Sequence, residues 1–338
     1  MKNIAWKFEA FGMNHLKVYE EEVPEIQDDE LLLEIKAVSL NYRDLLMIKG
    51  EYNPKLNLPM VPCSDGLGVV VKVGNNVKEF KEGDRVLPII TQGWHDGKLF
   101  REIHRRTLGG PLPGVLQKYF VVKASEVVPA PKNLTDVEAS TLPVAALTAW
   151  SALFEFGKPI PGQTLLTLGT GGVSIFALQF GKLLGLKVII TSSSNEKLER
   201  ARRLGADYTI NYQQNPDWEK EVQAITNSKG VDYVIEVGGV GTLEKSLRSV
   251  KSNGVVFLIG VLAGKKAPID LTSVLMQNIT IQGVFAGHKR SFVEMNQVFD
   301  TFSIKPVVDK VFPFEESPKA FEYMASGSHF GKVCISLS

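Results

Sequence analysis

The sequence predicts an α/β protein that combines a doubly wound parallel sheet with a second, β-rich domain. The chain has 338 residues, more than one hydrophobic core usually serves. Between residues 164 and 260, short apolar runs alternate with helical patterns, which is typical of a parallel sheet. A glycine-rich turn joins the first of these runs to the first helix, as in nucleotide-binding sheets.

The β-rich domain is predicted from both ends of the chain. Its N-terminal part contains short apolar runs broken by Gly, Pro and Asn. These runs lie at residues 31–38, 68–73 and 85–89. Residues 304–338 return to short strands and are expected to rejoin this domain. We therefore assign residues 1–130 and 290–338 to the β-rich domain and residues 131–289 to the sheet domain.

The sheet domain is expected to bind its ligand where the strands end. The strands are predicted at residues 164–168, 187–191, 208–210, 233–236 and 254–260. Because parallel strands end at one edge of the sheet, the loops that follow them lie together. Two of these loops are expected to line a nicotinamide and its ribose, unless they are plain turns. Their candidate residues are Val237, Gly238, Gly260, Val261 and Leu262.

The turn after the first strand has the pattern of a dinucleotide site. Gly169 ends the strand, and Gly171 lets the backbone approach a pyrophosphate that faces the N-terminus of the next helix. The third position of the motif is Ser174 instead of Gly or Ala, which requires slightly more room between helix and strand. The predicted cofactor contacts in this turn are Gly169, Thr170, Gly171, Gly172 and Val173.

The next strand indicates NADP(H) as the cofactor. An NAD site of this kind carries an Asp or Glu about 20 residues after the first glycine, and this chain has none there. Instead, three hydroxyls and an ammonium group can donate hydrogen bonds to a 2′-phosphate. They belong to Ser192, Ser193, Ser194 and Lys197. Ser194 or Asn195 can at the same time cap the helix that follows, which is expected over residues 196–204.

Composition argues against several other functions. The net charge of +1 gives no electrostatic support for binding nucleic acid or an acidic membrane. Residues 159–181 carry no charge, but their glycines, prolines and polar residues suit a buried strand and turn better than a membrane span. Two cysteines and the absence of a signal-peptide pattern predict a cytoplasmic protein. The dinucleotide site separately predicts a small molecule as the substrate.

Seven motifs extend these predictions to most of the chain. They lie at residues 40–44, 62–74, 83–86, 147–150, 169–174, 204–207 and 330–333. In this order they resemble the medium-chain dehydrogenase/reductase superfamily, and in particular its zinc-free, quinone-oxidoreductase-like branch. The resemblance implies a GroES-like first domain, a Rossmann domain and hydride transfer. It also implies a homodimer that pairs the strand near residues 280–284.

The resemblance also shows which metal ligands are missing. The positions that hold a catalytic zinc in the zinc alcohol dehydrogenases match Asn41, Ser64 and Val144 here, and none of these is a thiolate, imidazole or carboxylate. Residues 89–114, which match the structural zinc lobe of those relatives, contain no cysteine. We therefore expect no metal.

Without a Lewis acid, an acceptor that delocalises negative charge is easier to reduce than a simple ketone. By resemblance, the catalytic residues are Asn41, Tyr42 and Ser64, with Tyr42 as the proton source. The resemblance adds Thr148, Tyr212 and Lys332 as cofactor contacts. We predict NADPH-dependent reduction of quinones or α,β-unsaturated carbonyl compounds. Two alternatives remain open, a zinc-independent alcohol dehydrogenase and an NADPH-binding accessory protein with vestigial activity.

Overall fold

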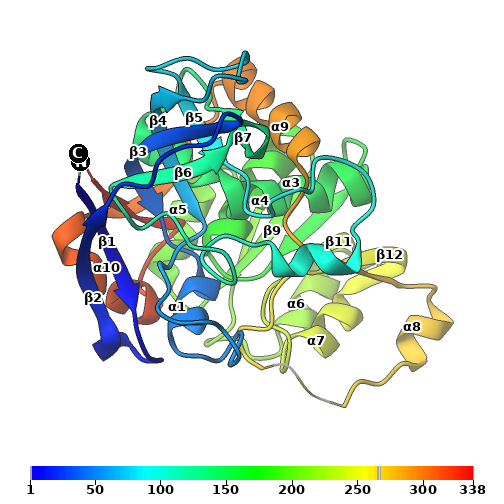
Figure 1. Ribbon diagram of the computed structural model, residues 1–338. Coiled ribbons are helices and arrows are strands. Elements are labelled where there is room, and N and C mark those ends of the chain that lie inside the picture. The colour runs from blue at the N-terminus through cyan, green and yellow to red at the C-terminus, as the bar shows by residue number, and fades with distance from the viewer. Residues whose placement is uncertain (1, 265, 267, 338) are drawn as a thin grey trace. The chain divides into compact units, whose positions relative to one another are not determined.

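The computed structural model describes residues 2–264, 266 and 268–337, which form two compact units (Figure 1). One unit consists of Met1–Leu147 and His288–Ser338, and the other of Thr148–Gly287. Residues 131–147, which the sequence places in the sheet domain, belong to the first unit. They do so because helix α2 (Asp136–Ser140) packs against strands of that unit.

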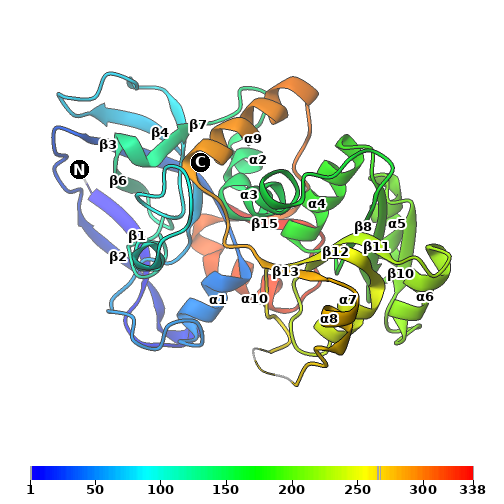
Figure 2. The same cartoon turned by 90° about the vertical axis from the view of Figure 1, so that its right-hand side faces the viewer.

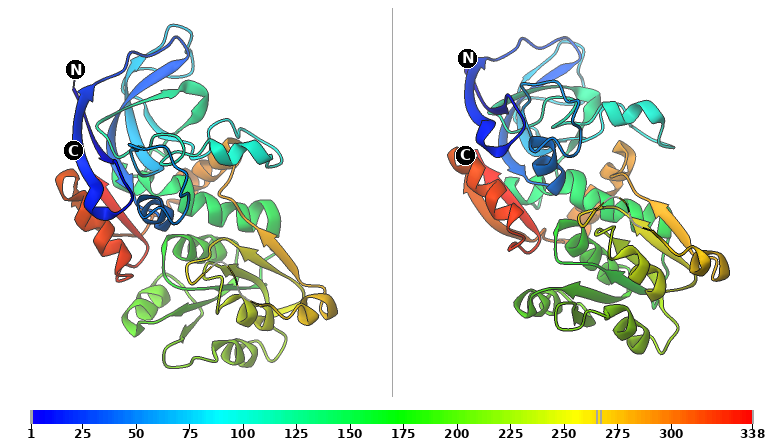
Figure 3. Two further views of the ribbon diagram at one scale, coloured as in Figure 1. Left: turned by 60° about the horizontal axis from the view of Figure 1, so that its bottom comes forward. Right: turned by 90° about the horizontal axis from the view of Figure 1, so that it is seen from below.

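The first unit is built around a mostly antiparallel sheet, with one parallel pair (β14 and β15), to which both ends of the chain contribute. Its strand order is β14-β15-β3-β4-β5-β7, with β6 also paired to β3. Strand β15 pairs antiparallel with β3, so the C-terminal segment returns to the N-terminal part of the chain (Figure 3). Strands β1 and β2 form a separate hairpin. The strands of this unit are β1 (Lys2–Phe8), β2 (Leu16–Glu22), β3 (Glu30–Ser39), β4 (Asp65–Val73), β5 (Arg85–Pro88), β6 (Tyr119–Lys123), β7 (Val127–Pro129), β14 (Val308–Pro313) and β15 (Lys332–Ser336).

The C-terminal part of this unit also contains a helix that the sequence analysis missed. Only short strands are predicted after residue 304, but α10 lies between β14 and β15. Its residues Ala320, Phe321 and Met324 are all buried, and their spacing is that of one helix face. Besides α2, the helices of this unit are α1 (Tyr42–Ile48), α9 (Lys289–Phe302) and α10 (Ser317–Ala325), together with the short 3-10 or π-helical segments η1 (Met13–His15), η2 (Arg101–Arg105), η3 (Ala124–Glu126), η4 (Leu142–Ala146) and η6 (Phe314–Glu316).

The second unit is the predicted doubly wound sheet. Its six strands are parallel in the order β10-β9-β8-β11-β12-β13 (Figure 2). All six residues of β11 are buried, as expected for a parallel strand covered on both faces. The chain runs from β8 to β10 in one direction and then crosses back to β11, so β8 and β11 are neighbours at the point where the order reverses. The strands are β8 (Thr164–Thr167), β9 (Lys187–Ser192), β10 (Tyr208–Asn211), β11 (Val231–Glu236), β12 (Val250–Leu258) and β13 (Thr280–Gly283).

The helices of the second unit follow the strands as the alternating pattern predicts. Helices α4 and α5 pack against β8, β9 and β10, and α7 packs against β11 and β12. They are α4 (Gly172–Leu183), α5 (Asn195–Arg203), α6 (Trp218–Ile225), α7 (Leu243–Ser249) and α8 (Thr272–Met276), preceded by α3 (Leu147–Trp150) and η5 (Ser151–Gly157). Within the described parts of the chain, no helix combines the length and the apolar character that crossing a membrane requires.

Candidate active site

The glycine turn after β8 leaves open space in front of helix α4. Gly169 has a φ of +72°, which favours glycine. Gly171 has an extended conformation that other residues could adopt, yet a Cβ built at either glycine would meet no heavy atom within 4 Å. Gly171 is also the N-cap of α4, so the free N–H groups of the first helical turn begin here. The turn therefore has the room and the donors that a pyrophosphate needs.

Ser174 fits the third position of the motif by forming a hydrogen bond. Its hydroxyl donates to the Leu168 carbonyl at 2.6 Å, and its own carbonyl accepts from the Thr167 hydroxyl at 3.4 Å. The side chain is buried between helix and strand. The serine that the sequence presents as a departure from the motif thus ties the start of α4 to the end of β8.

Hydrogen bonds connect the ends of neighbouring strands into one continuous edge. The Gly169 amide donates to the Thr191 hydroxyl at 3.2 Å, and the Tyr212 amide donates to the Ser192 carbonyl at 3.1 Å. At the next pair of loops, the Leu262 amide donates to the Val237 carbonyl at 3.3 Å. The structure therefore brings the loops that carry most of the predicted cofactor contacts of the second unit to the same edge of the sheet, whereas Thr148 lies in α3.

The serines after β9 have different environments. Ser192 is the last residue of β9 and is only 3% exposed. Ser194 caps α5, because its hydroxyl accepts from the Lys197 amide at 3.4 Å. Ser193 and Lys197 are partly exposed, and Tyr212 is exposed. Ser194 is therefore the N-cap of α5, and this cap involves the backbone amide of Lys197 and not its ammonium group.

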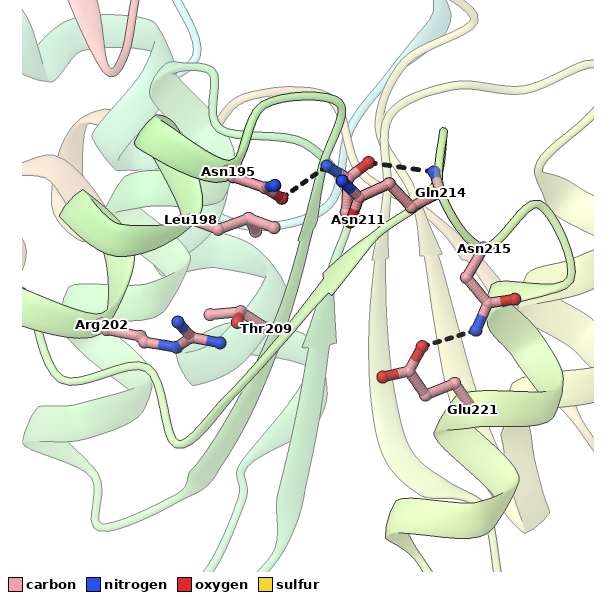
Figure 4. A pocket seen from close by; sticks show the side chains of 8 residues that line it. All are labelled: Asn195, Leu198, Arg202, Thr209, Asn211, Gln214, Asn215 and Glu221. Carbon is pink, nitrogen blue, oxygen red and sulfur yellow. Dashed lines mark hydrogen bonds between the residues drawn. The ribbon is translucent and has the colours of Figure 1, made fainter.

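A polar pocket of about 270 Å³ adjoins this group of residues (Figure 4). The Asn211 amide nitrogen donates to Asn195 Oδ1 at 2.6 Å, which fastens the end of β10 to the start of α5. Asn211 Oδ1 in turn accepts from the Gln213 amide at 3.0 Å. The pocket is lined by Asn195, Leu198, Arg202, Thr209, Asn211, Gln214, Asn215 and Glu221.

In the first unit, the three positions that match zinc ligands lie in one hydrogen-bonded cluster. The Lys332 ammonium group donates to Asn41 Oδ1 at 2.6 Å. The Ser64 hydroxyl donates to Asp65 Oδ1 at 2.6 Å, and Asp65 Oδ2 accepts from the Val144 amide at 3.0 Å. Asn41, Ser64 and Val144 are thus held by an ammonium group and a carboxylate of the protein itself.

Burial disfavours the charged forms of Asp65 and Lys332 in this cluster. Desolvation raises the pKa of Asp65, while the positive charge of Lys332 lowers it. Desolvation also lowers the pKa of Lys332, and the negative charge of Asp65 counteracts this effect. Lys332 is 3% exposed and its ammonium group also donates to the Leu40 carbonyl. In the structure the Lys332 ammonium group thus donates to Leu40 and Asn41. The sequence analysis predicts this lysine as a cofactor contact.

A second buried carboxylate fixes the start of helix α1. Asp44 Oδ2 accepts from the Asn41 amide at 2.8 Å, and Arg43 lies 3.3 Å from Asp44 Oδ1. Desolvation raises the pKa of Asp44 to about 6, against the positive charge of Arg43. Arg43 also donates to the carbonyls of Leu108 and Gly110, at 3.0 and 3.1 Å. The pair therefore anchors α1 to the loop before β6.

The remaining predicted residues differ in accessibility. Tyr42 is 38% exposed at the first position of α1, whereas Ser64 is fully buried. Thr148 lies in α3 and is buried. Among the described residues, no group of three or more His, Cys, Asp or Glu side chains could hold a metal ion.

The sequence analysis missed Asp65, Arg43 and Glu236 as residues that organise these sites. Asp65 directly follows Ser64 within a recognised motif, so its position could have been noticed. Glu236 ends β11 and is completely buried. The sequence does not reveal this burial, because a carboxylate at the end of a parallel strand can equally face solvent. These three side chains act by holding backbone, and their partners are set by the fold.

Comparison with known proteins gives matches along most of the chain. The family model of the alcohol dehydrogenase GroES-like domain matches residues 27–132, and that of the zinc-binding dehydrogenases matches residues 172–301. A zinc-type alcohol dehydrogenase-like protein of Schizosaccharomyces pombe is 44% identical, over 97% of both chains. The 2-methylene-furan-3-one reductase of Solanum lycopersicum is 32% identical, over 98% of this chain and 78% of its own. A solved NAD-dependent alcohol dehydrogenase is 32% identical with a TM-score of 0.91, covering 99% of this chain and all of that one.

Proposed function

The chain belongs to the medium-chain dehydrogenase/reductase superfamily and is an oxidoreductase that uses NAD(P), and on this basis we propose that it reduces quinones or α,β-unsaturated carbonyl compounds with NADPH. The observation that carries this proposal is the cluster around Asn41, Ser64 and Val144. Lys332 donates a hydrogen bond to Asn41, and Asp65 accepts hydrogen bonds from Ser64 and from the Val144 amide. The side chains of Asn41, Ser64 and Val144 offer zinc none of its preferred ligands.

The acceptor class follows from the chemistry that remains. An alkoxide that forms from a simple ketone needs a metal or a strong proton donor nearby. An enolate or quinol anion spreads its charge over conjugated atoms, so hydrogen-bond donors can stabilise it. The tomato relative is named as a reductase of a conjugated furanone, which supports the same class.

The proposed mechanism assigns separate tasks to the two units. When bound, the nicotinamide supplies a hydride to the conjugated carbon of the acceptor. The residues of the glycine turn and of the loops after β9, β11 and β12 hold the cofactor at the strand ends. Tyr42, the exposed member of the three catalytic candidates, donates a proton to the developing anion. Asn41 and Ser64 form the polar surroundings whose geometry Lys332 and Asp65 fix.

NADPH is the proposed cofactor because Ser193, Ser194 and Lys197 can surround a 2′-phosphate and no carboxylate follows β9 at the position that NAD requires. The pocket beside Asn195 and Asn211 adds further amide groups next to this position. Because one solved relative is named as an NAD-dependent alcohol dehydrogenase, the assay below compares NADPH with NADH.

An absorbance assay tests the whole proposal. The purified protein is mixed with NADPH or NADH and a panel of quinones, enones, saturated aldehydes and ketones, and the loss of nicotinamide absorbance is followed. We expect turnover with quinones or enones, preferentially with NADPH, and the same rates after treatment with a chelator. Elemental analysis that finds stoichiometric zinc would contradict the metal-free site.

The alternatives give different results in the same assay. Oxidation of alcohols with NADP⁺, without reduction of any quinone or enone, would identify a zinc-independent alcohol dehydrogenase. The similarity to zinc-type alcohol dehydrogenase-like proteins favours including this candidate. Saturable NADPH binding with negligible turnover of every compound would indicate an accessory protein.

A homodimer is part of the proposal. Strand β13 is an edge strand of the sheet. Leu271, the N-cap of α8, and Leu275 and Met276 within this helix are 63%, 78% and 76% exposed. An edge strand beside exposed apolar side chains is suited to pairing with a second copy of the chain. Ile281 of β13 is also exposed.

A further inference from the structure

Glu236 is a completely buried carboxylate that the mechanism above does not use. It is the last residue of β11, at the strand end where the sheet order reverses. Its Oε1 accepts from the amides of Gly238 and Gly239, at 2.7 and 3.0 Å, and from the Thr242 hydroxyl at 2.7 Å. Its Oε2 accepts from the Ser246 hydroxyl in helix α7. One carboxylate therefore receives four neutral donors.

These hydrogen bonds fold the loop after β11 around the carboxylate. Gly239 has a φ of +80°, and a Cβ built on it would lie 2.7 Å from the Gly264 carbonyl oxygen. A Cβ on Gly238 would lie 2.4 Å from the Thr242 hydroxyl oxygen. Two successive amides that point at one anion resemble the backbone nests that bind anions in other proteins. Here the anion is a side chain of the same loop.

The same arrangement positions the loop after β12. The Ile259 amide donates to the Glu236 carbonyl at 2.9 Å, and the Ala263 amide donates to the Gly238 carbonyl at 2.8 Å. A Cβ on Gly260 would lie 2.6 Å from the Val237 carbonyl oxygen, so the two backbones are in close contact. The loop after β12 thus takes its position from a loop that is folded on Glu236.

We propose that Glu236 is a positioning residue that shapes both loops to receive the nicotinamide end of the cofactor. This inference rests on the proposed function, in which Val237, Gly238, Gly260, Val261 and Leu262 line the nicotinamide and its ribose. The adenosine end is held elsewhere, by the turn after β8 and the residues after β9. Loss of the carboxylate therefore affects one end of the cofactor and spares the other.

The test compares NADPH with adenosine 2′,5′-bisphosphate, which carries the adenosine end without the nicotinamide. Binding of both is measured by calorimetry for the unmodified protein and for Glu236→Gln. The amide keeps the shape of the side chain but loses the charge that strengthens its hydrogen bonds. We expect the Kd for NADPH to rise by about tenfold, and the Kd for the bisphosphate to change by less than about twofold.

Asp232→Asn is the matched control. Asp232 lies on the same strand, is also buried, and accepts from the Thr164 amide at 2.8 Å, but it is at the opposite end of β11. It should leave both affinities unchanged. If Glu236→Gln does not fold, Thr242→Val removes a single donor and should weaken NADPH alone, by a smaller factor.

Each outcome separates the positioning role from the proposed function. An equal loss of affinity for both ligands, or no loss for NADPH, would overturn the role of Glu236. Failure of the unmodified protein to bind either ligand would instead overturn the proposed cofactor.

Discussion

At the scale of single residues, the proposed proton source can be tested against a neighbouring tyrosine. Tyr42→Phe removes the hydroxyl that would protonate the product, and we expect kcat to fall about 100-fold. Tyr52→Phe is the control, because Tyr52 is also exposed and its ring, which stacks with Arg43 at 5.5 Å, is retained. Steady-state kinetics with an active quinone or enone measures both. Equal rates for Tyr42→Phe and the unmodified protein would remove Tyr42 from the mechanism.

Ser192 determines the cofactor preference if the 2′-phosphate lies at the end of β9. Ser192→Asp places a carboxylate there, which repels the phosphate and can accept from the ribose hydroxyls of NADH. We expect the ratio of kcat/KM for NADPH to that for NADH to fall by about tenfold or more. Because Ser192 is buried, thermal unfolding of the variant is followed as well. Ser192→Ala, which adds no charge, should not gain activity with NADH.

The buried Asp44 should make stability depend on pH in an unusual direction. Its pKa is raised from 3.8 to about 6 by burial, so the folded state favours the protonated carboxyl. Protonation of Asp44 therefore stabilises the folded state at low pH, and this contribution is lost as the pH rises from about 4 through about 6. Lowering the pH from about 7 to about 5 should therefore stabilise the unmodified protein relative to Asp44→Asn by about 1 kcal/mol.

Denaturant unfolding at both pH values measures this difference, and subtraction of the variant removes the other titrating groups. Asp29→Asn is a control that should show no difference between the two pH values, because a hydrogen bond from Lys123 lowers the pKa of exposed Asp29 below its ordinary value of 3.8. A relative stability of Asp44→Asn that does not change with pH would show that Asp44 stays ionised.

At the scale of elements, hydrogen bonds fasten the loop within residues 89–114, which contains no cysteine. Glu126 accepts from the Gly93 amide at 2.6 Å and lies 2.9 Å from the His95 ring nitrogen. The start of α9 adds two more hydrogen bonds, from the amides of Lys289 and Arg290 to the carbonyls of Trp94 and His95, both at 3.0 Å. A buried carboxylate and the start of a helix therefore hold this loop in place.

Glu126→Ala should loosen this loop without unfolding the unit. It leaves the Gly93 amide without its acceptor, which costs about 1–3 kcal/mol locally. Trypsin reports the effect, because Lys98, Arg101 and Arg105 are exposed in the loop. We expect cleavage there to become several-fold faster, whereas Glu102→Gln in the same loop should leave the rate unchanged. Unaltered cleavage of Glu126→Ala would mean that other contacts suffice.

Helix α10 shows why element prediction failed at the C-terminus. This region is interrupted by Pro306, Pro313 and Gly331, which indicate short strands. Two such strands are present, β14 and β15. The helix between them is short, and its apolar face is satisfied only by packing in the core of the first unit. Short helices of this kind depend on tertiary contacts more than on local propensity.

At the scale of the whole molecule, the proposed dimer can be broken at α8. Leu275→Lys combined with Met276→Lys places two charges on the most exposed apolar side chains next to β13. We expect the double variant to sediment as a monomer, because burying an unpaired ammonium group is costly. Ile160→Lys is the control, since Ile160 is 65% exposed in the same unit but belongs to the segment before β8. A monomeric unmodified protein would contradict the proposal.

The sequence by itself determined the doubly wound sheet, the glycine turn before α4 and the missing metal ligands. These features depend on local periodicity, on turn residues and on the identity of single side chains, all of which can be read along the chain. Only the tertiary structure decided that Lys332 binds Asn41, 291 residues away, and that Glu236 organises two loops. A buried polar group must find its partners in whatever the fold places beside it, and sequence spacing does not contain that information.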